Sequence, residues 1–224
     1  MAGLIAIGPP WAGAPDALQS IIDGPVYSGL TPRWASGFIG GFIGRATSTW
    51  AGLMSLLPVQ IGLAVYNESE PLVSSPNRSF TVKDMKALLH HVARVQQNYT
   101  SYSINRTELW EYMSTNFFTL SAGPGVDLDC IYLVDRDTPF ALKFTKDDFS
   151  DVGDYVSTVK GDGTVPMISA ATPLAAWKAE GGYRVSGHPL DLGGTVSHMT
   201  MPQSEDVIGI VLDVLKYQRS LMSS

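Results

Sequence analysis

The segment Gly161–Pro166, with the sequence GDGTVP, constrains this chain more than any other, because it places Asp162 between two glycines. Glycine adopts backbone angles that larger residues resist, so the segment predicts a tight turn that presents a carboxylate. His198 follows after one further strand-like segment. An acid in a turn and then a histidine is the order of the last two members of a Ser…Asp…His triad. We therefore expect Asp162 and His198 to follow the carboxyl ends of neighbouring strands and to converge.

The nucleophile of such a triad is missing from the chain. No serine among the 224 residues lies in a Gly-x-Ser-x-Gly turn. A base and an acid without a serine retain little of the rate enhancement of such enzymes. We expect the serine to lie upstream of Met1, which would then be an internal methionine.

Hydrophobic periodicity predicts a doubly wound α/β sheet. Apolar runs predict strands, and stripes with helical spacing predict helices such as the last one, with Leu215 among its inward residues. Thr81 and Asp84 form a capping-box pattern at the start of one helix. Residues 25–80 are expected to be loops with short helices, residues 135–160 a polar excursion, and Pro173 an interruption of a helix. The predicted strands are Leu4–Ile7, Leu128–Val134 and Tyr183–Ser186, and the predicted helices are Pro15–Ile22, Thr81–Gln97, Glu108–Leu120, Pro166–Trp177 and Ser204–Tyr217.

Composition and motifs exclude several other functions. The net charge is −6 and the basic residues are scattered, which argues against nucleic-acid binding. The glycine turn lacks the lysine of a phosphate loop and the alternating carboxylates of a calcium loop. The sequence predicts neither a metal nor a cofactor. His188 is the other candidate for the base, but its position just before Pro189 favours a structural role. His90 and His91 lie within a helix, and the aspartates of residues 147–154 are typical of a solvated loop.

Four of the five asparagines open an N-glycosylation sequon, which predicts an exposed, glycosylated stretch and a protein of the secretory pathway. The lumen of the endoplasmic reticulum, a lysosome or vacuole, and secretion all fit. The segment 46–65 is long enough to span a membrane, but its polar residues and Pro58 favour a lipid-facing or substrate-facing cap segment. The four sequon asparagines are Asn67, Asn77, Asn98 and Asn105.

Five segments in order resemble the C-terminal half of the lecithin:cholesterol acyltransferase family, which includes phospholipid:diacylglycerol acyltransferases and lysosomal-type phospholipases. The GDGTVP segment with the following Ser169 and Ala170 is the most specific part of this resemblance. The matching segments are IAIGPPWAGA at 5–14, Arg45 with SLLP at 55–58, PGV and CIY at 124–126 and 130–132, GDGTVP at 161–166 and SHM at 197–199.

The resemblance implies an α/β-hydrolase fold with a cap, of which this chain would be the C-terminal half. Residues 1–24 and 121–224 would form part of the core, and residues 25–120 the cap insertion. Asp162 would be the triad acid and His198 the base, while Trp11 and Arg45 are expected in the substrate or cap region. Animal members pair the cysteine that matches Cys130 with one after the acid motif. This chain has no other cysteine, so Cys130 is expected to be a free thiol.

The implied chemistry is acyl transfer from a glycerophospholipid, through an acyl-serine, to an alcohol such as a sterol or diacylglycerol. Transfer to water would make the protein a phospholipase A. A membrane or lipoprotein surface is the expected partner. A further alternative is an inactive fragment or lipid-binding remnant of such an enzyme. In that case unpaired sheet edges would leave the isolated chain poorly soluble or molten.

Overall fold

A computed structural model describes residues 3–22, 51–59, 65–96, 106–116 and 122–222 of the chain. The protein is of mixed α/β class, with one parallel sheet, one mixed sheet and several helices. The chain divides into two compact units. The first unit comprises Met1–Trp11, Leu120–Thr138 and Val159–Ser224, and the second comprises Ala12–Thr119 and Pro139–Thr158.

The first unit is built on a parallel sheet of three strands in the order β1-β4-β7. Cys130 in the central strand pairs with Ala6 on one side and with Gly187 on the other. Parallel strands with apolar runs are typical of a sheet covered on both faces. The strands are β1 (Gly3–Ile7), β4 (Asp127–Leu133) and β7 (Val185–Leu190). The first two lie close to the predicted positions, but β7 runs beyond the predicted Tyr183–Ser186 segment to Leu190.

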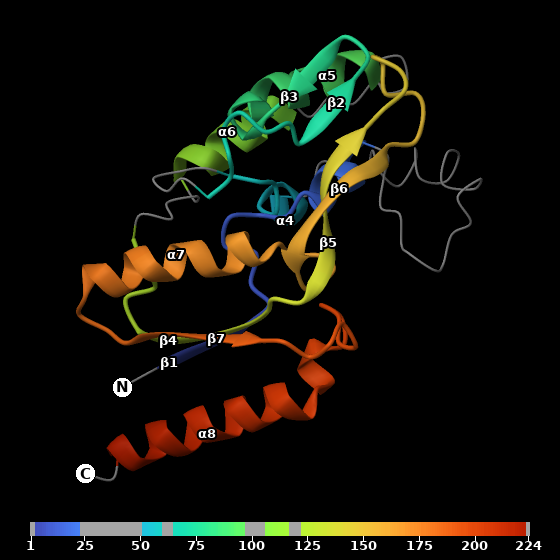
Figure 1. Ribbon diagram of the computed structural model, residues 1–224. Helices are drawn as coiled ribbons and strands as arrows, with labels where there is room; N and C mark the ends of the chain where they lie inside the picture. Colours follow the sequence, from blue (N-terminus) through green and yellow to red (C-terminus); the bar gives the residue numbers. More distant parts are fainter. Residues whose placement is uncertain (1–2, 23–50, 60–64, 97–105, 117–121, 223–224) are drawn as a thin grey trace. The chain divides into compact units, whose positions relative to one another are not determined.

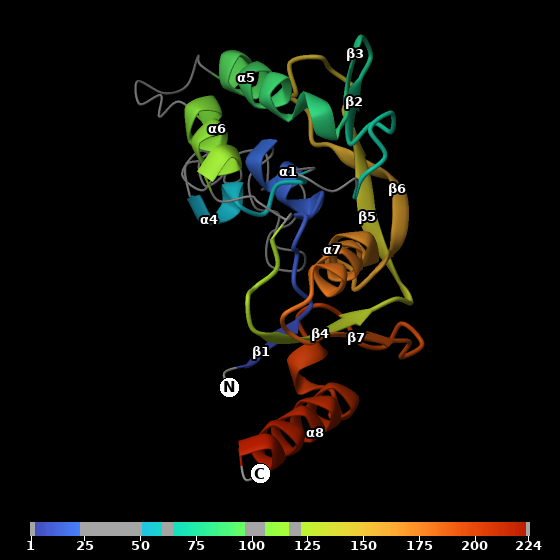
Figure 2. The same ribbon diagram turned by 90° about the vertical axis from the view of Figure 1, so that its left-hand side faces the viewer.

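Two helices cover the two faces of this sheet, α7 (Met167–Glu180) on one and α8 (Glu205–Met222) on the other (Figures 1 and 2). The prediction that Pro173 interrupts the first of them was wrong. Proline removes one backbone hydrogen bond, but Leu174 and Trp177 are buried on the same helix and hold it against the sheet.

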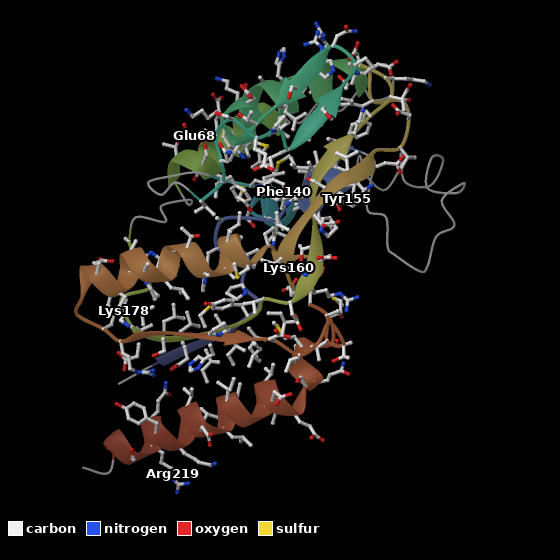
Figure 3. All side chains as sticks on the ribbon, viewed as in Figure 1. Glu68, Phe140, Tyr155, Lys160, Lys178 and Arg219 are labelled. Carbon is white, nitrogen blue, oxygen red and sulfur yellow. The ribbon has the colours of Figure 1, made fainter. Side chains whose placement is uncertain are left out.

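Helix α8 follows a short 3-10 helix, η4 (Met201–Gln203), and packs through Val207 against Ile131 and Leu133 of β4. Leu215 was predicted to point inward but is 49% exposed. The buried positions Val207 and Val214 are seven residues apart, which leaves position 215 turned away from that face. Figure 3 shows Arg219 on the outer side of the same helix.

A mixed sheet in the order β3-β2-β5-β6 corrects two predictions. The hairpin β2–β3 lies where loops and short helices were expected, and β5 and β6 replace the expected polar excursion. In β6 exposed and less exposed residues alternate, a strand pattern that the aspartates of this region had obscured. The strands are β2 (Val73–Ser75), β3 (Arg78–Phe80), β5 (Arg136–Lys143) and β6 (Asp154–Gly161).

Helices make up much of the second unit. The predicted capping box is confirmed, since the backbone N–H of Thr81 donates to Asp84 at 2.9 Å. The following helix buries Met85, Leu88 and Leu89 as predicted and lies beside the β2–β3 hairpin (Figure 1). The helices are α1 (Asp16–Ile22), α4 (Ala51–Met54), the 3-10 helix η2 (Val82–Asp84), α5 (Met85–Gln96) and α6 (Arg106–Asn116).

Within the described ranges, no helix combines the length and the apolar character needed to cross a bilayer. Most of the segment 46–65 lies outside those ranges.

The packing between β4 and α8 predicts which apolar residues matter for stability. Ile131 is fully buried between these elements, so Ile131→Ala should lower the free energy of unfolding by about 2–5 kcal/mol. Leu212 on α8 is 50% exposed, and Leu212→Ala should change it by no more than about 0.5 kcal/mol. Pulse proteolysis across a urea series measures both, and equal losses would contradict the packing described.

Candidate functional site

Asp162 lies in the turn that follows β6, and its own carboxylate closes that turn. Oδ1 accepts hydrogen bonds from the backbone N–H groups of Thr164 at 2.9 Å and Val165 at 2.7 Å. The backbone N–H of Asp162 donates to the carbonyl of Val165 at 3.2 Å. The side chain is almost completely buried. One carboxylate oxygen is thus fixed by the turn, and the other, Oδ2, is left to face a partner.

The two glycines of this turn are required for different reasons. Gly163 has a φ of 93°, which favours glycine, as predicted. Gly161 is needed for space instead, because a Cβ there would lie 2.3 Å from the carbonyl oxygen of Val165 and 2.6 Å from Oγ1 of Thr138. The hydroxyl of Thr138 also accepts a hydrogen bond from the N–H of Gly163 at 2.9 Å. Thr138 is fully buried and was not singled out from the sequence.

His198 lies in the loop after β7 and contacts Asp162 twice. Its ring Nδ1 is 2.8 Å from Oδ2 of Asp162, and its backbone N–H donates to the Asp162 carbonyl at 2.9 Å. The His198 side chain is 30% exposed, whereas that of Asp162 is 3% exposed. A carboxylate accepts, so a neutral His198 donates from Nδ1 in this arrangement. In this neutral tautomer Nε2 is the ring nitrogen that carries no proton.

Gly8, at the end of β1, is the third element of the site. Its backbone N–H donates to the carbonyl of Ile131 at 2.8 Å, and its φ is 59°. A Cβ at this position would lie 3.2 Å from both Oδ2 of Asp162 and Nδ1 of His198. The backbone after β1 therefore packs directly against the acid–base pair. From the sequence, Gly8 stands out only as part of the 5–14 segment that carries the family resemblance. A glycine that ends an apolar strand-like run before two prolines was the available signal.

The expectation that both residues follow neighbouring strands is corrected. His198 follows β7 of the parallel sheet, but Asp162 follows β6, a strand of the other sheet. Their convergence does not come from adjacent strands. It comes from the hydrogen bonds between the Asp162 turn and the His198 loop, both of which belong to the first unit.

A second Asp–His pair lies on the same sheet and has a different geometry. His188 is within β7, and its Nε2 is 2.9 Å from Oδ1 of Asp129 on β4. Arg184 donates to both oxygens of Asp129, at 2.8 and 2.5 Å. Burial alone would raise the pKa of Asp129, but hydrogen bonds and charges from Arg184 and His188 hold it below its ordinary value. The cationic Arg184 already neutralises this carboxylate, so the geometry supports the structural role predicted for His188.

Trp11 and Cys130 lie together in the first unit. The Trp11 ring meets that of Trp177 edge-on, with centroids 5.2 Å apart. Cys130 is a free, fully buried thiol, and burial raises its pKa to about 11. At neutral pH it is therefore an unreactive core residue. The predicted substrate or cap role of Trp11 stays a prediction, and Arg45 lies outside the described residues.

Two of the four sequon asparagines are described, and both are exposed. Asn77, in the β2–β3 turn, donates from Nδ2 to Asp147 at 2.6 Å and from its backbone at 3.0 Å. Hydrogen bonds from Ser75 and Asn77 lower the pKa of Asp147 to about 2. Asp147 thus ties its loop to the hairpin. Asn98 and Asn105 lie outside the described residues.

No group of three or more His, Cys, Asp or Glu side chains in the described ranges is arranged to hold a metal ion. In comparisons with known proteins, no protein-family model and no curated sequence matches this chain.

The Asp129 cluster predicts a specific dependence of stability on pH. A carboxylate with a lowered pKa stabilises the fold fully above the ordinary value of about 4, and this contribution is lost as the pH falls below it. Asp129→Asn should lower the free energy of unfolding by about 1.5–3 kcal/mol at pH 7. This variant should also lose less of its free energy of unfolding on acidification than the parent chain does. Asp213→Asn, with a carboxylate side chain 78% exposed, is the control. Unfolding free energies from urea series at several pH values test this, and parallel acid profiles for the parent and Asp129→Asn would refute it.

Proposed function

We propose that this chain supplies the acid, Asp162, and the base, His198, of a lipid acyltransferase whose nucleophilic serine lies outside these 224 residues. The observation that carries the proposal is the 2.8 Å contact between Oδ2 of the buried Asp162 and Nδ1 of the partly exposed His198. A buried carboxylate at Nδ1 selects the tautomer whose Nε2 accepts a proton and stabilises the imidazolium that follows. The Asp129–His188 pair engages the opposite ring nitrogen and an arginine, so it does not offer this function.

The proposed reaction has two half-reactions, and in each of them Nε2 of His198 first takes a proton and then returns one. The serine oxygen attacks an ester carbonyl of a glycerophospholipid while Nε2 takes the serine proton. The ester C–O bond then breaks, and Nε2 returns the proton to the departing lysophospholipid oxygen, which leaves an acyl-serine. A sterol or diacylglycerol hydroxyl next attacks the acyl-serine and loses its proton to Nε2. The acyl–serine C–O bond then breaks, and Nε2 returns this proton to the serine oxygen, which restores the free serine and the neutral imidazole. Water in place of that alcohol gives phospholipase A activity.

The architecture supports the fold that this proposal needs. A parallel β1-β4-β7 sheet between α7 and α8, with the acid–base pair near the end of β1, fits the C-terminal half of an α/β-hydrolase. Residues 25–120 would then be the cap insertion that presents lipid. The exposed sequons at Asn67 and Asn77 fit a glycoprotein of the secretory lumen that acts at a membrane or lipoprotein surface.

The test is an activity assay on a polypeptide that extends upstream to include a Gly-x-Ser-x-Gly motif. With a fluorescent phospholipid as acyl donor, Asp162→Asn should lower the rate about 10⁴-fold and His198→Ala about 10⁶-fold. His188→Gln, which alters the other Asp–His pair, should retain most of the activity. Each variant is also checked for unchanged folding by circular dichroism.

Two outcomes would overturn the proposal. Full activity in Asp162→Asn or His198→Ala would remove the assignment of acid and base. An upstream reading frame without the serine motif would instead favour an inactive or lipid-binding remnant. The ratio of released fatty acid to acylated alcohol distinguishes a phospholipase from a transferase. It is measured with sterol and diacylglycerol present.

A further inference from the structure

A groove in the second unit gathers positive charge on a chain whose net charge is −6. Its volume is about 510 Å³, and it lies between β3 and the helices η2 and α5. Four cationic side chains line it against one carboxylate, that of Asp84, which is held in the capping box by Thr81. The four cations are Arg78, Lys83, Lys86 and Arg94.

The local structure explains why these cations share one face. Lys86, His90 and Arg94 follow one another at intervals of four along α5, so they lie on one side of the helix. The opposite side is occupied by the buried Met85 and Leu89. Because the core fixes how α5 is rotated, the cationic side is directed to the groove, where Arg78 of β3 also lies.

The lining of the groove combines this charge with a rigid aromatic surface. The rings of Phe80 and His91 are both more than 90% buried and have centroids 5.9 Å apart. Nε2 of His91 is 2.6 Å from the carbonyl of Asp147, so it donates there. The aromatic rings are therefore fixed in place, while the cations around them are exposed.

The cations can accept an external anion at little cost. Lys83 forms an ion pair with Glu68, and Lys86 forms one with Glu111. The side chains of these two lysines and two glutamates are all at least 43% exposed. Exposed ion pairs of this kind contribute about 0–1 kcal/mol, so a phosphate group can displace them. Arg78 and Arg94 offer planar donors that suit phosphate oxygens.

We propose that this groove binds the phosphate headgroup of an anionic phospholipid at a bilayer surface. The inference rests on the proposed function, because a lipid acyltransferase must reach its donor at such a surface. Charge complementarity between the groove and a phosphate supports it. Tyr112 on α6 supports it as well, because this aromatic side chain is 59% exposed and directly follows Glu111, whose carboxylate pairs with Lys86. Aromatic side chains with a polar tip are favoured at membrane interfaces.

The experiment measures binding of the 224-residue chain to vesicles by flotation. Vesicles of phosphatidylcholine with phosphatidic acid should bind the chain, and vesicles of phosphatidylcholine alone should not. The double variant Arg78→Gln/Arg94→Gln should bind the anionic vesicles about 30-fold more weakly, at about 1 kcal/mol for each cation removed. Both residues are exposed, so the fold should persist, which circular dichroism and the unfolding temperature confirm.

The matched control is Lys178→Gln/Lys216→Gln, which removes the same charge from exposed positions in the first unit (Lys178 is labelled in Figure 3). Equal weakening by this control would overturn the proposal, because net charge alone would then explain binding. Unchanged binding of Arg78→Gln/Arg94→Gln, equal binding to neutral vesicles, or binding of inorganic phosphate without vesicles would overturn it as well. Vesicle binding needs neither Asp162 nor His198. A failure of the acyl-transfer assignment would therefore leave vesicle binding unchanged, so the two proposals can fail separately.

Discussion

The central strand of the parallel sheet, β4, is the element on which the candidate site depends. It hydrogen-bonds to β1 on one side and to β7 on the other, both in parallel. Parallel pairing brings the carboxyl ends of these strands to one edge of the sheet, where Gly8 begins one loop and the His198 loop begins nearby. The carbonyl of Ile131 in β4 then accepts the N–H of Gly8 at 2.8 Å, which fixes the first loop against the strand.

The acid reaches this edge by a different route. Asp162 follows β6 of the mixed sheet, and its turn is stabilised by hydrogen bonds to its own Oδ1. The turn and the His198 loop are joined by a backbone bond and a side-chain bond. A Cβ on Gly8 would lie 3.2 Å from both partners of this contact, closer than ordinary packing, so three segments of the chain meet at the pair. A buried carboxylate and a partly exposed imidazole are the result, and this arrangement suits the role proposed for the pair.

The parts of this fold that sequence reasoning could predict are those set by local patterns. The strand at Cys130, the capping box at Thr81 and the helical stripe at Leu88 follow from periodicity and from short-range hydrogen bonding, and all are confirmed. The pairing of Asp162 with His198 was predictable from chain order. That Asp162 follows a strand of the other sheet was not predictable. Aspartates masked the alternation of β6, and no local pattern assigns a strand to one sheet or another. Gly8, Thr138 and Asp129 were missed for the same reason, since their roles arise from contacts distant in sequence.

The central claim is that Asp162 selects the His198 tautomer with the proton on Nδ1. Nitrogen-15 NMR of the histidine rings in the 224-residue chain measures this directly, because the two ring nitrogens of a neutral imidazole differ when one carries the proton. The account predicts an Nδ1–H tautomer for His198 that Asp162→Ala abolishes, beside an opposite preference in His188, whose Nε2 contacts Asp129. An Nε2–H tautomer of His198 that is unchanged by Asp162→Ala would contradict it.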